Sequence, residues 1–280
     1  MAKLFNIISI LFTYVIVFQS FLYSLKAVSD PNILLIQSTT STRDSGFYKY
    51  IIPKFEDEYN IKAYVVAVGT GQALKNAKNC DGDILIVHSR ELEEKFVEDG
   101  FGIQREDLMY NDYIIVGPKD KHIKTDINHG VIDIFENIID EEYLFVSRGD
   151  NSGTYLAELN IWDKSSISPE SLDNNLYIKT GQGMGPTLNV AIGLNAHTFT
   201  DRATWSRFKN KRDHVILFEH DPLLLNQYGI IKINPDHCKN INHVAANKFF
   251  SWILSDAGQI LISKYKVNDQ VLFSPGSIYK

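Results

Sequence analysis

One stretch of the chain, VSRGDNSGTYLAEL (146–159), combines a permanent positive charge with small hydrogen-bond donors. Arg148 ends an apolar run, and three small residues then open a segment of helical periodicity: Ser152, Gly153 and Thr154. A guanidinium offers a planar fork of donors that suits oxyanions. The first turn of a helix adds backbone N–H groups that lack partners. The stretch therefore predicts an anion site. The alternative is an ion pair between Arg148 and Asp150, which we favour less because similar loops accompany this one.

Two earlier loops carry the same chemistry. The segment QSTTSTRDSG (37–46) places a run of hydroxyl side chains between an apolar run and a helical pattern, which is more than a helix cap requires. The segment VGTGQAL (68–74) holds Gly69 and Gly71, which allow the backbone to approach a ligand closely, with the hydroxyl of Thr70 between them. A fourth loop, GQGMGPT (181–187), is either a further donor loop or only a turn.

The sequence shows no catalytic signature. It contains no G-x-S-x-G, H-E-x-x-H or C-x-x-C motif, and the glycines at 181–187 fit neither a dinucleotide fingerprint nor a P-loop. His88 is interpreted as a packed polar residue rather than a base. Three aspartates near the loops offer either acid–base chemistry or plain caps and ion pairs: Asp44, Asp150 and Asp201. We expect a binding protein and not an enzyme, with no cofactor and no metal ligated directly.

A site made of donors selects its ligand by protonation state. Hydroxyls, amide N–H groups and an arginine all donate, so a fully deprotonated oxyanion fits them. Sulfate, molybdate and tungstate carry no proton near pH 7, whereas phosphate carries one and needs a facing acceptor. Phosphate would be favoured if the carboxylate of Asp44 or Asp150 pointed into the cleft.

The elements that position these loops form an alternating pattern. Short apolar runs alternate with helical segments such as 47–58, and they are continuous rather than strictly alternating, which is typical of strands covered on both faces. The predicted strands are 33–37, 62–68, 83–88, 113–118, 142–148 and 214–219. This order predicts an α/β fold with mostly parallel sheets. Because ligands of such sheets bind at the carboxyl ends of strands, the loops are expected to share one cleft.

The first 27 residues differ from the rest of the chain. One early lysine, a long apolar stretch and the small-residue end SLKA are typical of a secretory signal, with an uncleaved N-terminal anchor as the alternative. Either segment would export the domain. The net charge is −6, and no basic block is present, so nucleic acid is not an expected partner. Cys80 and Cys238 fit no metal spacing, and whether they pair is left open.

At these motifs the chain resembles the tungstate-binding proteins of bacterial ABC importers, a branch of the periplasmic solute-binding proteins. The matching stretches lie within about residues 32–262, in the family's order, and they are STTSTRDSG, VAVGTGQAL, DILIVH, MYNDYIIVGP, FVSRGDNSGT, GMGPTLNVA and HTFTDRATW. One departure is Tyr155, where a histidine is common in the family. The resemblance implies a two-lobed type II binding-protein fold with an interlobe cleft. It also implies an integral-membrane permease and a cytoplasmic ATPase as partners.

The same resemblance implies boundaries and ligands for this chain. Residues 28–112 and 202–280 would form the first lobe and residues 113–201 the second, after a signal peptide at 1–27. The implied anion ligands are Thr39, Thr40, Ser41, Thr70, Gly71, Arg148, Ser152, Gly153 and Thr154. The expected function is capture of tungstate by an exported, monomeric protein. A binding protein for molybdate, sulfate or phosphate is the alternative.

Overall fold

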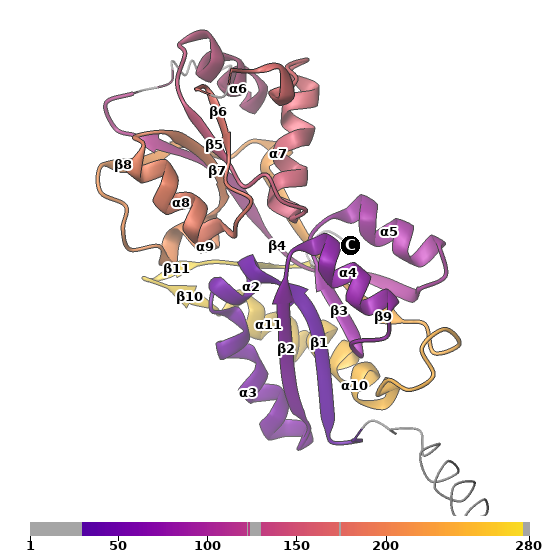
Figure 1. The fold of residues 1–280 in the computed structure, drawn as a ribbon. Helices are drawn as coiled ribbons and strands as arrows, with labels where there is room; N and C mark the ends of the chain where they lie inside the picture. The colour runs from indigo at the N-terminus through magenta and orange to yellow at the C-terminus, as the bar shows by residue number, and fades with distance from the viewer. Residues whose placement is uncertain (1–29, 122, 124–129, 174, 277–280) are drawn as a thin grey trace, which may run out of the picture.

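The computed structural model describes residues 30–121, 123, 130–173 and 175–276. The predicted signal segment at 1–27 lies outside the described residues. The described chain forms two lobes that are joined by long strands (Figure 1). The two-lobed α/β architecture expected from the sequence is confirmed.

Lobe 1 carries the hydroxyl-rich loop and the VGTGQAL loop. Its sheet has the order β2-β1-β3-β9, with parallel pairing of β1 to β2 and β3. The strands are β1 (Ile33–Thr39), β2 (Lys62–Val68), β3 (Ile84–Val87) and β9 (Leu225–Ile233). The helices are α2 (Thr40–Asp44), α3 (Phe47–Tyr59), α4 (Thr70–Lys78), α5 (Arg90–Glu98), α10 (His243–Leu254) and α11 (Asp256–Ser263).

Strand β3 shows why the sequence pattern is continuous rather than alternating. Ile84 and Ile86 face a core shared with α3 and α10, whereas Leu85 and Val87 face a core shared with α4 and α5. All four side chains are fully buried. Helices therefore cover both faces of the sheet, as the apolar runs predicted.

Lobe 2 carries the arginine loop. Its strand β5 is parallel to β6 and β7, and apolar clusters pack on both faces of this sheet. The strands are β5 (Phe145–Ser147), β6 (Tyr177–Lys179), β7 (His197–Asp201) and β8 (His214–Phe218). The helices are α6 (Val131–Asp140), α7 (Gly153–Lys164), α8 (Met184–Gly193) and α9 (Arg202–Arg207).

Strand β4 (Gly102–Pro118) belongs to both lobes. Residues 102–112 pair with β9 in lobe 1, and residues 113–118 pair with β7 and β8 in lobe 2. Because β8 lies in the sheet of lobe 2, we propose that lobe 2 extends to Phe218. The chain then returns to lobe 1 between Phe218 and Leu225, later than the boundary at 201 that the sequence suggested.

Short elements complete the chain, and one covalent link holds lobe 1 together. The short elements are η1 (Pro169–Ser171), η2 (Pro222–Leu224), β10 (Lys266–Val267), β11 (Gln270–Val271) and β12 (Ser274–Pro275).

Cys80 and Cys238 form a disulfide between the loop after α4 and the loop after β9. This settles the pairing that the sequence left open.

Candidate functional site

The loops after β2 and β5 meet where the two lobes touch. The backbone N–H of Gly153, at the start of α7, donates to Thr70 Oγ1 at 3.0 Å. The backbone N–H of Gly71 donates to the carbonyl of Asn151 at 3.1 Å. The N-terminal turns of α4 and α7 therefore face each other, and the two lobes are in contact. The carboxyl ends of the strands position both turns, as the fold predicts.

Arg148 is the charged centre of this contact region. The residue is 2% exposed, and its Nη2 donates to Asp150 Oδ2 at 2.6 Å. The other oxygen of Asp150 accepts from the hydroxyl of Ser152 at 2.6 Å. The ion pair between Arg148 and Asp150, which the sequence offered as the alternative to an anion site, is thus present. One carboxylate occupies two of the donors that the sequence assigned to an oxyanion.

Two buried donors of lobe 2 nevertheless have no partner. Among the described residues, Arg148 Nε and Thr154 Oγ1 have no partner with hydrogen-bond geometry, and the hydroxyl of Tyr113 is the polar group that lies near Thr154. Leaving such a group unpaired in a buried site costs roughly 1–3 kcal/mol, and more for a charged group. A bound oxyanion would satisfy donors of this kind. The two atoms therefore point to a ligand that completes the site.

Lobe 1 contributes a cluster of hydroxyls, the hydroxyl loop (residues 38–42). Thr39 Oγ1 lies 2.7 Å from Thr42 Oγ1 and 3.3 Å from Ser41 Oγ. All three residues are buried, whereas Thr40 is half-buried. Each hydroxyl has one hydrogen to give. In this arrangement the hydroxyls partner one another and His88, so an anion would have to replace bonds inside the cluster.

His88 lies next to the hydroxyl loop, although its sequence position predicted only a packed polar residue. It follows β3, is buried, and its Nε2 lies 3.1 Å from Ser41 Oγ. Burial, together with the positive charge of Arg148, lowers the pKa of His88 to about 4. The imidazole is therefore neutral near pH 7. Its position after a strand, at the same sheet edge as the loops, was the signal that could have identified it.

The glycine-rich loop at 181–187 supports the site from outside. The backbone N–H of Gly181 donates to the carbonyl of Arg148 at 2.8 Å. Thr180 Oγ1 also donates to that carbonyl, at 3.3 Å. Gly181 itself is exposed. The loop therefore holds the backbone of Arg148 and presents no donor to the contact between α4 and α7 in the described structure.

The other aspartates take the plain roles that the sequence allowed. Asp44 pairs with Arg43 at 2.8 Å, and both side chains are exposed. Asp201 is fully buried and caps α9 by accepting from the backbone N–H and the hydroxyl of Thr204. Burial raises the pKa of Asp201. Of the three aspartates, Asp150 is the one that contacts predicted ligands.

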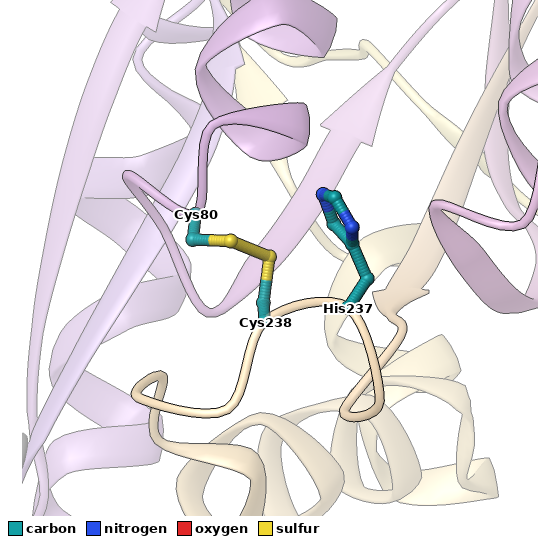
Figure 2. A group of neighbouring side chains, drawn as sticks. All are labelled: Cys80, His237 and Cys238. Carbon is teal, nitrogen blue, oxygen red and sulfur yellow. A yellow bond between two sulfur atoms is a disulfide. The ribbon is translucent and has the colours of Figure 1, made fainter.

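A second group of side chains has the spacing of metal ligands. Cys80, His237 and Cys238 lie close together in lobe 1 (Figure 2). The two sulfur atoms are bonded to each other, and His237 Nε2 lies 2.8 Å from the carbonyl of Lys78. The potential ligand atoms are thus engaged elsewhere.

None of the helices in the described part of the chain has both the length and the apolar content that a membrane span needs.

Known proteins are similar to this chain in sequence and in fold. The family model described as "PBP superfamily domain" matches residues 27–257. A protein of Peptoclostridium acidaminophilum named tungstate-binding protein TupA is 42% identical over 83% of this chain and 81% of its own length. Two solved structures also match. The tungstate binding protein TupA from Desulfovibrio alaskensis G20 is 39% identical, with a TM-score of 0.76, and the match covers 87% of this chain and 98% of that chain. The tungstate ABC transporter from Geobacter sulfurreducens is 40% identical, also with a TM-score of 0.76, and the match covers 85% of this chain and 100% of that chain.

Proposed function

The chain belongs to the tungstate-binding proteins of the PBP superfamily, and from this premise we propose that it captures tungstate between its lobes for an ABC importer. The observation that carries the proposal is the pair of buried, unpartnered donors, Arg148 Nε and Thr154 Oγ1. They lie in the loop that meets lobe 1 across the cleft. A tetrahedral dianion supplies acceptors in several directions, so it can satisfy donors from both lobes at once.

The ligand set that we propose comes from three loops. From lobe 1 the hydroxyl loop supplies Thr39, Thr40 and Ser41, and the first turn of α4 supplies Thr70 and Gly71. From lobe 2 come the guanidinium of Arg148 and the first turn of α7, with Ser152, Gly153 and Thr154. The contacts between α4 and α7 bring the two groups of donors together, but they also engage the N–H groups of Gly71 and Gly153, so an anion would have to replace these two bonds.

The preference for tungstate over phosphate rests on the relatives and not on the acceptors around the site. The carboxylate of Asp150 lies beside the donors, and each of its oxygens accepts one hydrogen bond, from Arg148 or from Ser152. Because a carboxylate oxygen has two lone pairs, it could also accept from a protonated phosphate, so phosphate is the anion that a binding test must exclude. Tungstate and molybdate have the same shape and charge, so molybdate is the second candidate.

A solute-binding role also fits the organisation of the chain. We propose that the protein acts outside the cytoplasm and delivers its anion to a membrane permease driven by an ATPase. The chain performs no catalysis in this role and needs no cofactor. The apolar segment at 1–27 supports export, either as a cleaved signal or as an anchor.

Titration calorimetry on residues 28–280 tests the function. Tungstate, molybdate, sulfate and phosphate are added separately to ligand-free protein at one pH and one salt concentration. We expect tight binding of tungstate and much weaker binding of sulfate and phosphate. A preference for phosphate would assign the cleft to a protonated anion instead. Binding of none of the four would contradict the function.

A further inference from the structure

His88 joins the hydroxyl loop to the two strands that connect the lobes. Its Nε2 lies 3.1 Å from Ser41 Oγ. Its Nδ1 lies 3.0 Å from Asn226 Oδ1 on β9 and 3.0 Å from the hydroxyl of Tyr113 on β4. Asn226 is paired in register with Asn111 on β4. One chain of hydrogen bonds therefore runs from the proposed ligand loop to both connecting strands.

The direction of these hydrogen bonds follows from the amide of Asn226. Its Nδ2 donates to Asn111 Oδ1 at 2.7 Å and to the hydroxyl of Tyr228 at 3.1 Å. The amide oxygen is therefore the atom that faces His88. Because an amide oxygen only accepts, Nδ1 of His88 must carry a hydrogen.

The neutral ring then fixes the role of Ser41. With a pKa lowered to about 4 by burial, His88 carries a single hydrogen near pH 7, and that hydrogen is on Nδ1. Nε2 is left with a lone pair. The hydroxyl of Ser41 must donate its hydrogen to this lone pair.

This direction conflicts with Ser41 as an anion ligand. A serine hydroxyl has one hydrogen. While that hydrogen is given to His88, Ser41 presents only lone pairs to an oxyanion, and two acceptors repel each other. Ser41 becomes a donor to the anion when His88 carries its hydrogen on Nε2 and donates to Ser41.

Moving the hydrogen to Nε2 also changes the far end of the chain. Nδ1 becomes an acceptor, so Asn226 must turn its amide to present Nδ2. The oxygen of Asn226 then faces Asn111, which must turn its own amide in order to donate. Asn111 Nδ2 is buried and makes no hydrogen bond within the described part of the chain. The reversed network gives this group a partner.

We propose that His88 is a positioning residue whose hydrogen moves from Nδ1 to Nε2 when an oxyanion binds Ser41, which reverses the hydrogen bonds of Asn226 and Asn111 on the connecting strands. The inference rests on the proposed function, because it takes Ser41 as an anion ligand. The ring releases one proton to water from Nδ1 and takes one from water at Nε2, so its charge is unchanged.

The packing of α7 on the imidazole of His88 determines when its hydrogens can exchange with water. A Cβ at Gly153 would lie 2.7 Å from His88 Nδ1 and 2.5 Å from the His88 carbonyl, so α7 packs directly on this residue. His88 is 4% exposed while α7 packs on it, so we expect water to reach the ring mainly when the lobes separate. The exchange of hydrogens therefore precedes closure, and the closed protein holds the form that the anion selected.

Histidine tautomers are measured directly by two-bond ¹H–¹⁵N correlation spectra of ¹⁵N-histidine protein. Spectra are recorded without ligand and with saturating sodium tungstate, and binding is checked by calorimetry on the same sample. We expect the hydrogen of His88 on Nδ1 without ligand and on Nε2 with tungstate. The His88→Asn variant assigns the signals. A hydrogen on Nε2 without ligand, or no change in a protein that binds tungstate, would overturn the proposal.

Calorimetry distinguishes a failure of the proposed tungstate binding from a failure of the proposed hydrogen shift on His88. Absence of heat with tungstate would contradict the proposed function, and the ligand-free spectrum alone would then decide whether the network runs as described. Heat without a tautomer change would leave the function standing and reject the switch.

Three variants test the mechanism of the switch. Asn226→Ala removes the acceptor that faces Nδ1, so the ligand-free protein should populate the Nε2–H form. Tyr113→Phe is its matched control, since it removes the other group at 3.0 Å from Nδ1 but keeps that acceptor, and it should retain Nδ1–H. Ser41→Ala should keep Nδ1–H even with tungstate bound. An unchanged response in Ser41→Ala would reject Ser41 as the trigger.

Discussion

Asp150 lies two residues from Arg148 and receives a hydrogen bond of 2.6 Å from its guanidinium. The one arginine of the proposed site is therefore already paired with an anion of the protein. An incoming dianion shares the guanidinium with this carboxylate and is repelled by it. The pair also fixes Arg148 in place, which lowers the cost of ordering it on binding.

Replacement of Asp150 by asparagine should strengthen tungstate binding. Asparagine keeps an oxygen that can accept from Arg148 but removes the negative charge beside the anion. We expect the dissociation constant to fall by about tenfold, which corresponds to ~1.4 kcal/mol. Calorimetry at low salt measures it. Weaker binding would show that the carboxylate acts mainly by orienting Arg148. Asp44→Asn is the matched control, because Asp44 pairs with Arg43 on the surface.

Removal of the guanidinium should have the largest effect on affinity. Arg148→Ala loses the permanent charge and leaves an anion oxygen without its donor, so we expect a loss of at least about 2 kcal/mol. Arg43→Ala serves as control, because that side chain is exposed. Equal affinity of Arg148→Ala and the unmutated protein would exclude Arg148 from the site.

Local sequence was sufficient for the fold, and it indicated the loops in which we propose the site. The apolar run at β3 predicted a strand covered on both faces, and small donors after β1, β2 and β5 predicted a shared cleft. These are properties of neighbouring residues. They do not depend on which distant segments finally meet.

Features that depend on distant contacts were not predictable in the same way. The role of His88 arises because β3 brings it beside Ser41, Tyr113 and Asn226, which are far away in the sequence. The second lobe boundary depends on distant contacts in the same way, since the lobe to which we assign β8 is decided by its pairing with β4. The pairing of Arg148 with Asp150 is local, but sequence alone does not decide between an ion pair and a free ligand.

Addition of one methyl group at Gly153 should hinder closure. A Cβ there would lie 2.5 Å from the carbonyl of His88, a backbone atom that cannot move aside cheaply. Overpacking of this kind typically costs about 1–3 kcal/mol, so Gly153→Ala should bind tungstate about ten- to a hundredfold more weakly. Small-angle scattering should show the variant more open. The matched control is Gly183→Ala, where a Cβ meets nothing within 4 Å. Equal effects of the two substitutions would contradict this reading.

Reduction of the disulfide should lower stability without changing affinity. The bond joins Cys80 to Cys238, which are 158 positions apart in the sequence, and it lies away from the contacts between α4 and α7. Loop-closure entropy for such a length amounts to about 5 kcal/mol in the unfolded state. Denaturant unfolding with and without a dithiol reductant measures the loss. A reduced protein with full stability, or with altered tungstate affinity, would contradict the assignment of a purely structural role.

Glu158 should make the folded protein less stable as the pH rises. This carboxyl group lies on the buried face of α7, where it accepts hydrogen bonds from Ser147, Trp162 and Tyr177. Burial raises the pKa of Glu158 from 4.5 to about 7. The folded state therefore binds a proton more tightly than the unfolded state, and the free energy of unfolding falls between about pH 4.5 and pH 7 and levels off above.

The isosteric variant isolates this contribution. Glu158→Gln keeps the shape of the side chain and removes its titration, so it should be more stable than the unmutated protein at pH 8 by up to ~3 kcal/mol. Below pH 4.5 the two proteins should be equally stable. Glu170→Gln is the control, because Glu170 is exposed and paired with Lys179. Buried Glu93, whose pKa burial also raises to about 7, adds a dependence of the same sign that both variants retain. A pH profile of Glu158→Gln parallel to that of the unmutated protein would show that Glu158 is not the titrating group.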